Sequence, residues 1–561
     1  MFRTKYLDYT ELTAQLQAWA KAHPQYVRLS TLGRSAEGRD IPLVTIGREP
    51  DNHRPAIWVD GNMHATELCG SSVALAIAED VISIHGGKAP RGLPAHMAET
   101  LRESLFYVVP RISPDGAEAV LKTGRYVRSS PIDERRHKGH AYWESADIDG
   151  NGDINFMRQE SDDGELVELP GHPNVMVPRM PEDPPPYYKL YPEGRIVNFD
   201  GRRVPDPYFL SDNQYDFNRN FPYSWAPEHE QEGAGDYPGS APETRAIMDW
   251  ATAHPNIFVW LNLHTFGGVL IRPLGDKPDD KMDQYDLAVY RQVEAWMTQF
   301  TGYPTVSGFH EFLYVPEKPL KGDMTDYAYH QRGALAYVIE LWDLFTQLGI
   351  ERKKPFVDVY SRLDRKDYVT LAQWDKDVNK GRIFKAWRKA KHPQLGDIEV
   401  GGLDVRVGIS NPPYEKIAEV CEKQSDAFLR VAALVPRVAV QVVKSEKLGG
   451  DLTRIELRLV NRGYFGTYGL SSARKLPFSE PLRVTAEGEG VSLAAPLESV
   501  VEVGHLDGWG QGLYSGANVF FPWTRGNIHE RFVTLVARGK GKLRVRVGSV
   551  RVGYQKLDIE T

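Results

Sequence analysis

The sequence has little cysteine, no long apolar run and no excess of positive charge. Only Cys69 and Cys421 occur among 561 residues, so we expect both to be buried and reduced, as in a cytoplasmic protein. No stretch reaches the ~20 apolar residues of a membrane span, and residues 1–8 have neither the apolar core nor the cleavage site of a signal peptide. The formal net charge of −7 gives no reason to expect a nucleic acid or an anionic membrane as a partner.

The length of the chain and a change of pattern near residue 437 predict more than one domain. A chain of 561 residues is too long for one typical hydrophobic core. Beyond residue 437 apolar and polar residues alternate, which indicates half-buried antiparallel strands. For example, Ile455, Leu457 and Leu459 alternate with Arg454, Glu456 and Arg458. We therefore predict a β-sandwich at residues 437–561, whereas residues 346–436 have the pattern of connecting helices and loops.

Three polar motifs follow or end strand-like apolar runs in separate parts of the chain. The sequence His-x-x-Glu occurs three times, but only the match from His64 to Glu67 comes just after such a run. His264 and Glu340 have similar contexts. The apolar runs are residues 56–59, 257–261 and 334–341. Because sites in open α/β sheets lie outside the carboxyl ends of the strands, these side chains are predicted to meet.

His64, Glu67 and His264 have the composition of a catalytic zinc site. Such sites commonly use three protein ligands, here two histidines and a carboxylate, and leave a fourth position for water. The metal lowers the pKa of that water toward ~7, so that it can attack a carbonyl. The sequence therefore predicts one zinc ion held by these three residues.

Four further motifs occur in a fixed order around these residues. They are Ser-Pro-Asp-Gly at residues 113–116, with Arg128 13 residues after Asp115, Asp-Phe-Asn-Arg-Asn-Phe at 216–221, Pro-Glu-Thr-Arg-Ala at 242–246, and Asp-Tyr-Ala-Tyr at 326–329, which begins 14 residues before Glu340. Over roughly residues 5–345 the chain resembles a zinc metallocarboxypeptidase of the carboxypeptidase A family. The resemblance implies an α/β domain with a mixed sheet and helices on both of its faces.

The resemblance also implies roles for the residues around the metal. Glu340 would be the general base that takes a proton from zinc-bound water and passes it to the leaving amine. Arg128 would stabilise the oxyanion, and Asn218 with Arg219 would grip the terminal carboxylate of a peptide. Asp216 would accept a hydrogen bond from the first zinc-bound histidine and so fix its tautomer.

Three more residues are candidates for contact with the substrate. Tyr314 is the nearest match to the tyrosine that covers the substrate in this family. Asp323 and Thr325 fall on the segment that walls the side-chain pocket, where a carboxylate would favour a basic or polar terminal residue. Alternatively, Asp323 points to solvent or binds Lys321, and the pocket then has a broad apolar preference.

A long insertion, at about residues 129–213, separates Arg128 from the Asn218 motif. It contains an Asp-rich loop with oxygen-bearing side chains at alternate positions and a glycine at the sixth, as in the first half of a calcium-binding loop. The candidate calcium ligands are Asp147, Asp149, Asn151 and Asp153. However, Arg158 stands where an EF-hand would place its bidentate glutamate, so a polar turn cluster is the alternative interpretation.

These observations predict a zinc carboxypeptidase domain at residues 1–345, followed by the connecting region and the β-sandwich. The function expected is that of a zinc-dependent exopeptidase that removes C-terminal residues from peptides with a free carboxyl terminus. One alternative is a zinc amidase acting on cell-wall peptides or acylated amino acids. Another is a peptide-binding module without catalysis, although the presence of Glu340 argues against it. The sequence leaves the oligomeric state open.

Overall fold

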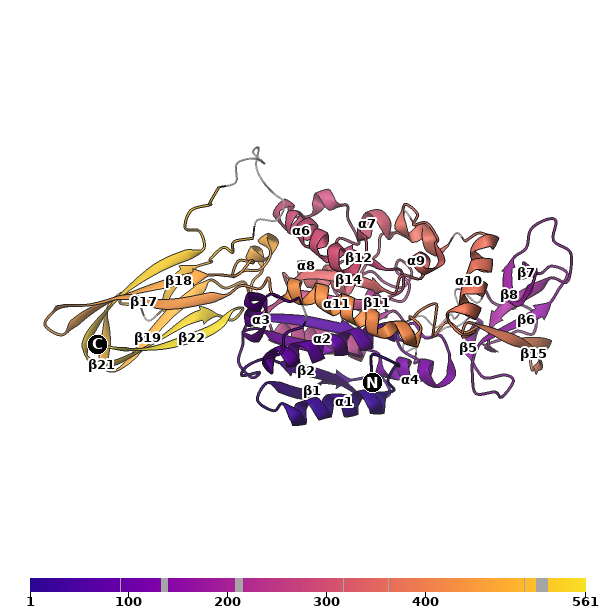
Figure 1. Cartoon of the computed structure of the whole chain (residues 1–561), viewed down its shortest axis with the longest axis horizontal. Coiled ribbons are helices and arrows are strands. Elements are labelled where there is room, and N and C mark those ends of the chain that lie inside the picture. The colour runs from indigo at the N-terminus through magenta and orange to yellow at the C-terminus, as the bar shows by residue number, and fades with distance from the viewer. Residues whose placement is uncertain are drawn as a thin grey trace.

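The computed structural model describes the chain except for residues 91, 133–139, 207–214, 316, 362, 499 and 511–522. An α/β body with an eight-stranded sheet lies in the middle of the molecule (Figure 1). A C-terminal antiparallel β region lies at one end of its long axis, and a smaller antiparallel sheet lies at the other end.

The eight-stranded sheet is mixed, as the resemblance implies. Its strand order is β1-β2-β4-β3-β11-β14-β12-β13. Strands β4, β3, β11 and β14 are parallel neighbours, whereas the pairs β1–β2, β2–β4 and β12–β14 are antiparallel. The strands are β1 (Val27–Arg34), β2 (Asp40–Ile46), β3 (Ala56–Gly61), β4 (Leu105–Val109), β11 (Ile257–Thr265), β12 (Val269–Arg272), β13 (Thr305–Ser307) and β14 (Leu335–Leu341).

Helices cover both faces of this sheet. Strands β3, β4 and β11 are buried along their whole length, which is typical of parallel strands between two layers of helices. One apolar core includes residues of α2, α6 and α11, and a second core includes residues of α5 and α8. The helices of the body are α1 (Tyr9–Ala22), α2 (Cys69–His85), α3 (Ala95–Arg102), α4 (Pro114–Thr123), α5 (Pro242–Ala253), α6 (Gln284–Thr301), α7 (Gly308–Glu311), α8 (Met324–His330), α9 (Leu344–Leu348) and α11 (Ile417–Ala432).

The long insertion forms strands rather than a structureless loop. Four of its strands belong to an antiparallel sheet with the order β15-β16-β6-β9-β7-β8, which we call the insertion sheet. Arg158 of β6 ties the sheet together, because its guanidinium donates to Glu399 of β16 and to Glu168 of β7, each at 2.7 Å. The strands are β5 (Tyr142–Ser145), which pairs with β10 (Gly194–Val197), and β6 (Phe156–Glu160), β7 (Leu166–Leu169), β8 (His172–Pro178) and β9 (Tyr188–Pro192).

The region 346–436 differs from the expectation of connecting helices and loops. It contains the helices α10 (Arg365–Asp377) and α11, as expected. However, it also supplies two strands, β15 (Phe384–His392) and β16 (Gly396–Leu403), to the insertion sheet. Arg388, Lys389 and Lys391 of β15 are exposed, and β15 pairs in a hairpin with β16. β16 in turn pairs with β6, where Glu399 lies beside Arg158, 241 residues earlier in the chain. A polar hairpin that joins its sheet over such a distance gives little local signal.

The C-terminal region is an antiparallel β-sandwich, as predicted. Its strand order is β17-β18-β21-β19-β20, and β22 also pairs with β21. The first half of the long strand β21 pairs with β18 and its second half with β22, so one strand contributes to both layers. Ile455, Leu457 and Leu459 are fully buried in the core between the layers. The strands are β17 (Val438–Gly449), β18 (Leu452–Asn461), β19 (Leu482–Ala495), β20 (Val500–Gly504), β21 (Glu530–Ser549) and β22 (Gly553–Glu560).

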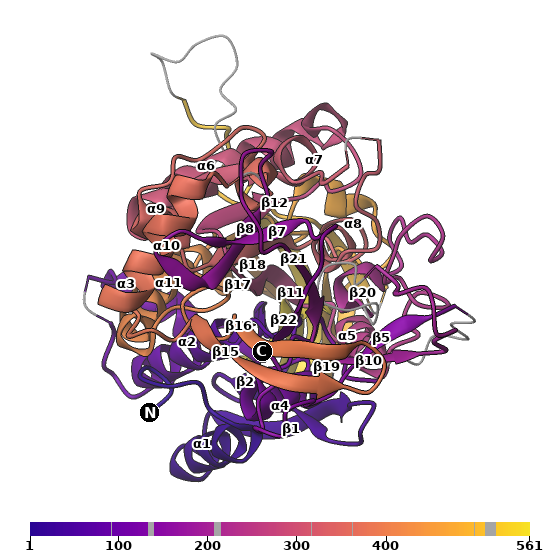
Figure 2. The ribbon, with the colours of Figure 1, turned by 90° about the vertical axis from the view of Figure 1, so that its right-hand side faces the viewer.

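The two additional β structures lie at opposite ends of the central strands. Arg551 of the sandwich is fully buried and donates to the carbonyl of Ile257, the first residue of β11. At the other end, Phe266, just beyond β11, faces a cavity that Val175 of β8 and Phe384 of β15 also line. Figure 2, which views the molecule from the insertion side, shows β7, β8, β15 and β16 in front of β11. The insertion sheet therefore lies at the carboxyl ends of the central strands and the sandwich at their amino ends.

Both cysteines are buried and free of disulfide bonds. Cys69 begins α2 and Cys421 lies in α11. Burial raises the pKa of the Cys421 thiol to about 12, so it is protonated at neutral pH. Among the helices of the described residues, none is long and apolar enough to span a membrane.

Candidate active site

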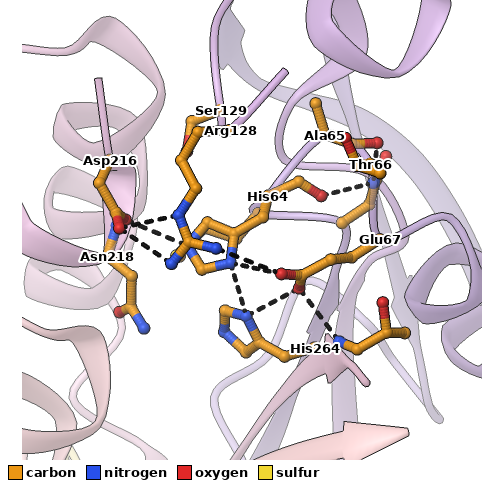
Figure 3. Close-up of polar contacts among 12 residues, drawn as sticks. His64, Ala65, Thr66, Glu67, Arg128, Ser129, Asp216, Asn218 and His264 are labelled. Atoms are coloured by element: carbon orange, nitrogen blue, oxygen red, sulfur yellow. Dashed lines mark hydrogen bonds and ion pairs between the residues drawn. The ribbon is translucent and has the colours of Figure 1, made fainter. Parts of the chain in front are cut away.

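Three adjacent parallel strands bring the predicted metal ligands and the predicted base to one place. In the pair β11–β14, His264 lies beside Glu340, and in the pair β3–β11, Leu263 lies beside Gly61, the last residue of β3. The loop that follows Gly61 supplies His64 and Glu67 (Figure 3). The carboxyl ends of these strands therefore meet as the sequence indicates.

His64, Glu67 and His264 form a compact buried cluster. The Nδ1 atom of His64 lies 2.8 Å from Glu67 Oε1, and the Nδ1 atom of His264 lies 2.9 Å from Glu67 Oε2. The two Nδ1 atoms are 3.0 Å apart (Figure 3). Two imidazole nitrogens and a carboxylate at this spacing make a donor set typical of catalytic zinc.

The remaining ring nitrogens show why this cluster suits a cation. His64 Nε2 lies 3.0 Å from Asp216 Oδ1, and His264 Nε2 lies 2.6 Å from Asn262 Oδ1. Because both partners are acceptors, each ring holds its hydrogen on Nε2 and directs the Nδ1 lone pair toward Glu67. Two lone pairs and a carboxylate that face one another repel, and a metal ion between them removes that repulsion. The residues present therefore fit zinc.

A chain of polar groups behind His264 was missed from the sequence. Asn262 donates through Nδ2 to Asp60 Oδ1 at 2.5 Å, and Asp60 also accepts from Trp58 Nε1 at 2.7 Å. Burial raises the pKa of Asp60 to about 7. The spacing of Asn262, two residues before His264 in the same strand, could have indicated that both side chains lie on one face of β11. Asn262 also pairs in register with Asp60. These residues orient His264 as Asp216 orients His64.

Glu340 lies close to the metal ligands with one oxygen free. Its Oε2 atom is buried and has no hydrogen-bond partner among the described residues. Burial, followed by the charge of nearby Glu67, raises the pKa of Glu340 well above its ordinary value, although Arg128 opposes the shift. An unpaired carboxylate oxygen with a raised pKa in a cleft is suited to accept and release a proton.

Arg128 and His64 share one carboxylate. The Nε and Nη2 atoms of Arg128 each lie 3.0 Å from Asp216 Oδ2, while Nη1 is 3.5 Å from Glu67 Oε1. The carbonyl of Arg128 accepts from the backbone N–H of Ala65 at 2.7 Å, so the backbone is held as well. The guanidinium is thereby fixed beside the metal cluster (Figure 3).

Asn218 and Arg219 follow Asp216 on the short 3₁₀ helix η1 (Phe217–Arg219). The Asp216 side chain accepts from the Asn218 N–H at 2.8 Å, and Asn218 Oδ1 accepts from the N–H of Met324 at 2.8 Å. Arg219 donates through Nη1 to the Asn218 carbonyl at 2.7 Å. Both residues line a cleft of about 80 Å³ whose other walls include His64, Arg128, His264 and Glu340.

A comparison with protein families agrees with this geometry. The zinc carboxypeptidase family model matches residues 12–165 and 202–348, which together are more than half of the chain. The chain belongs to the zinc carboxypeptidase family. A second model, of a domain of unknown function, matches residues 437–560.

Individual relatives match shorter parts of the chain. Carboxypeptidase B of Astacus astacus is 32% identical over 113 residues, which are 20% of this chain and 34% of the relative. An inactive metallocarboxypeptidase of Ajellomyces dermatitidis is 32% identical over 114 residues, 20% of this chain and 18% of the relative. The chain thus spans about a third or less of the length of these relatives. The structure of carboxypeptidase A from Helicoverpa armigera is 18% identical and has a TM-score of 0.39, with 67% of this chain and 72% of that chain covered.

The three further residues predicted to contact a substrate also line the cleft. Tyr314 is 60% exposed and stands at the rim, whereas Asp323 and Thr325 are buried. Asp323 caps α8 by accepting from the N–H groups of Thr325 and Asp326 at 2.8 and 2.9 Å. Lys321 pairs with Glu230 instead of Asp323. The effect of Asp323 on the terminal residue stays a prediction, and its carboxylate has a structural task that the sequence did not indicate.

The Asp-rich loop places two of its four predicted calcium ligands together. Oxygens of Asp147, Asp149 and Glu193 lie within 4.8 Å of one another. The sequence did not single out Glu193, which begins the turn into β10 and whose oxygens accept from the backbone N–H groups of Ile148 and Asn155, each at 2.7 Å. Calcium binding by this loop stays a prediction.

The other two predicted calcium ligands have protein partners. Asn151 donates through Nδ2 to Asp149 Oδ1 at 2.5 Å, and Asp153 is 3.1 Å from Arg406. Arg388 of β15 also lies 3.1 Å from Asp149. Arg158, at the position of the EF-hand glutamate, lies in β6, so the loop does not continue into an EF-hand.

Proposed function

We propose that this protein is a zinc-dependent exopeptidase that removes C-terminal residues from peptides with a free terminal carboxylate. The observation that supports it most is a shared cleft. Arg219 and Asn218, which suit a carboxylate, line the same small cleft as His64, His264 and Glu340. A peptide end held by the first pair has its last peptide bond beside the metal cluster.

His64, Glu67 and His264 would hold the zinc ion. When bound there, zinc lowers the pKa of a coordinated water and polarises a carbonyl. Asp216 and Asn262 keep the hydrogens of the two rings on Nε2, so each Nδ1 is free to act as a ligand. The protein thus fixes the donor set before any substrate arrives.

Glu340 would move the proton during hydrolysis. Its free Oε2 accepts a proton from the attacking water and then delivers it to the nitrogen of the leaving amino acid. The raised pKa of Glu340 makes the carboxylate a stronger base for the first transfer, and its protonated form is still acidic enough to protonate an amine.

Arg128 and Arg219 would handle negative charge at two points of the substrate. Arg128, held by Asp216, stabilises the charge that develops on the carbonyl oxygen, where a fixed donor is worth roughly 3–4 kcal/mol. Arg219 presents a planar fork that matches a terminal carboxylate. This second contact favours a carboxypeptidase over an enzyme that cuts within chains.

A pair of peptides that differ only in a free or amidated carboxyl terminus tests the proposal. We expect the wild-type protein to hydrolyse the free form, and Arg219→Ala to raise the KM for that form by about 30-fold, since a hydrogen bond to a charged group contributes ~1.5–3 kcal/mol. Arg245→Ala, which alters an exposed arginine on α5, is the matched control. If the wild-type protein cleaves both peptides equally well, the exopeptidase assignment is wrong.

A further inference from the structure

A second cavity lies beside the catalytic cleft, between the central body and the insertion sheet. Its volume is about 200 Å³, and its wall is mainly aliphatic and aromatic. Phe266, Leu344 and Phe345 come from the central body, whereas Val175 and Phe384 come from β8 and β15. An apolar cavity of about 150 Å³ holds one benzene ring. This cavity therefore has room for a somewhat larger apolar group.

Two aromatic residues of the cavity wall lie next to catalytic-site residues. Phe266 lies two residues after His264, and Tyr360 donates its hydroxyl to the Phe266 carbonyl at 2.5 Å. A Cβ atom on Gly267 would lie 2.1 Å from Tyr360 Oη and 3.6 Å from Glu340 Cβ. The absence of a side chain at Gly267 thus lets Tyr360, a wall residue of the cavity, lie next to the proposed base.

The cavity and the cleft have different walls. Among the described residues, none lines both of them. Asn218 and Arg219 line only the cleft, which fixes the terminal carboxylate on that side. With the terminal carboxylate held in the cleft, the acyl side of the scissile bond is the part of a substrate left to occupy the cavity.

One polar group in the cavity wall has no partner. The Nε1 atom of Trp387 is buried, and none of the described residues accepts its hydrogen. Arg158 lies over the Trp387 ring, 4.6 Å from its centroid, and so restrains the indole. A buried donor without an acceptor is unfavourable. A carbonyl group of a bound ligand would satisfy it, which suggests an apolar ligand with an acyl carbonyl rather than a pure hydrocarbon.

We propose that this cavity binds an apolar group, of the size of a medium acyl chain or one aromatic side chain, on the acyl side of the scissile bond. The assignment rests on the proposed function, because it takes the terminal carboxylate to be held by Arg219. The insertion sheet then acts as part of the substrate site, and substrates with a bulky apolar group upstream of the cleaved bond are preferred.

Equilibrium binding to a protein that does not turn over tests this assignment. The ligands are N-octanoyl-glycyl-lysine and N-acetyl-glycyl-lysine, with the same pair ending in phenylalanine, and the protein is zinc-loaded Glu340→Gln studied by calorimetry. We expect the octanoyl form to bind at least about 30-fold more tightly, because each buried methylene contributes roughly fourfold. Equal affinity of the octanoyl and acetyl forms in both pairs would overturn the proposal.

Filling the cavity provides the matched comparison. Leu371 of α10 lines the cavity, whereas Val369 on the same helix is 41% exposed. In the Glu340→Gln background, Leu371→Trp should reduce the octanoyl preference to less than about threefold, and Val369→Trp should leave it unchanged. Ile409→Phe, at another wall position, is a second filling variant in case the first folds poorly. A preference that survives both filling variants would place the acyl chain elsewhere.

Failure of the cavity assignment and failure of the exopeptidase proposal give different results. If wild-type protein hydrolyses none of the peptides, but the octanoyl preference exists and is lost on filling, the cavity still binds the apolar group. The exopeptidase proposal then falls, and with it the placement of that group relative to a scissile bond. If wild-type protein hydrolyses the acetyl and octanoyl peptides equally and binds them equally, the exopeptidase proposal stands and the cavity assignment falls.

Discussion

The insertion sheet and the C-terminal sandwich are both antiparallel β structures added to one α/β body, but they meet it at opposite ends. The insertion sheet contacts the carboxyl ends of the central strands, where the metal ligands lie, and one of its cavities is adjacent to Glu340. The sandwich contacts the amino ends through buried groups such as Arg551. In an α/β sheet only the carboxyl ends are close to the chemistry. Changes in the insertion should therefore affect substrate use, and changes in the sandwich should affect stability.

The largest expected effect is at the carboxyl ends. Glu340→Gln should lower turnover by at least about 10³-fold, because general base catalysis contributes 10²- to 10⁴-fold and the same group also serves the leaving amine. Zinc content and unfolding should stay at the wild-type values. Steady-state kinetics, elemental analysis and denaturant unfolding measure the three quantities. Glu232→Gln, in another His-x-x-Glu sequence, is the control and should keep full activity. If both variants lose turnover to a similar extent, Glu340 is not the general base.

The reverse pattern is expected at the amino ends. Arg551 is fully buried, donates to the carbonyls of Tyr468 and Ile257, and lies over the Phe258 ring. Arg551→Ala should destabilise the protein by ~3 kcal/mol, since one buried and one partly buried carbonyl lose their donor and a cavity forms. We expect kcat/KM to change by less than about twofold, because the site is at the other end of the strands.

Denaturant unfolding and peptide hydrolysis, measured on the same preparations, check this contrast. Arg538→Ala changes an exposed arginine of the same sandwich and should affect neither quantity. If Arg551→Ala lowers kcat/KM tenfold while stability is unchanged, the division of roles between the two ends is wrong.

The junction with the sandwich should also give stability a dependence on pH. Asp286 of α6 accepts from the N–H groups of Ser471 and Ser472 in η5 (Ser471–Lys475), and burial raises its pKa to about 6 from an ordinary 3.8. The folded state therefore holds this proton more tightly than the unfolded state. The contribution is fully present below pH ~4 and is lost as the pH rises through ~6, with a total of ~3 kcal/mol.

Asp286→Asn isolates that contribution. The free energy of unfolding of the wild-type protein, relative to the variant, should fall by ~2–3 kcal/mol between pH 4 and pH 7.5. Asp280→Asn, at an exposed position, should show no such trend relative to wild type. A wild-type protein that gains stability over the variant as the pH rises would contradict the sign of the shift.

The smallest expected effect is that of calcium on the insertion. If Asp147, Asp149 and Glu193 bind Ca²⁺, then 1 mM CaCl₂ should stabilise the zinc-loaded protein by ~1–2 kcal/mol, as for a ligand present at about 10 times its Kd. Glu193→Gln should abolish the shift in thermal unfolding, and Asp163→Asn, also in the insertion, should not. An equal response to MgCl₂, or none to CaCl₂, would count against the site.

The parts of the site that the sequence predicted are those with strong local signals. The strands before His64, His264 and Glu340 are continuous apolar runs, and the order of the short motifs placed Arg128 and Asn218 beside them. Contacts between distant segments had no such signal. The partnership of Asp216 with Arg128 depends on how two loops fold together over 88 residues, which no spacing rule gives.

The fold was predicted less well where strands are polar or short. The alternation of apolar residues in β18 indicated the sandwich correctly, because one face of that strand is fully buried. In β15, no continuous row of apolar residues faces a core, and the strand is stabilised by pairing with β16 rather than by burial. Glu193 was missed for a related reason, since it meets Asp147 only after the chain has made four intervening strands.

The pairing of β16 with β6 has a consequence for the biosynthesis of the protein. Residue 399 must be made before Arg158, synthesised about 240 residues earlier, finds its carboxylate, and α11 must be made before α2 and α6 are covered. A nascent chain that has emerged only to residue 348 therefore lacks the core residues of α11. It also lacks the residues of β15 that line the cavity beside the insertion sheet. We do not expect the segment that matches the family to fold on its own, and a fragment that ends there should be retained by chaperones or degraded.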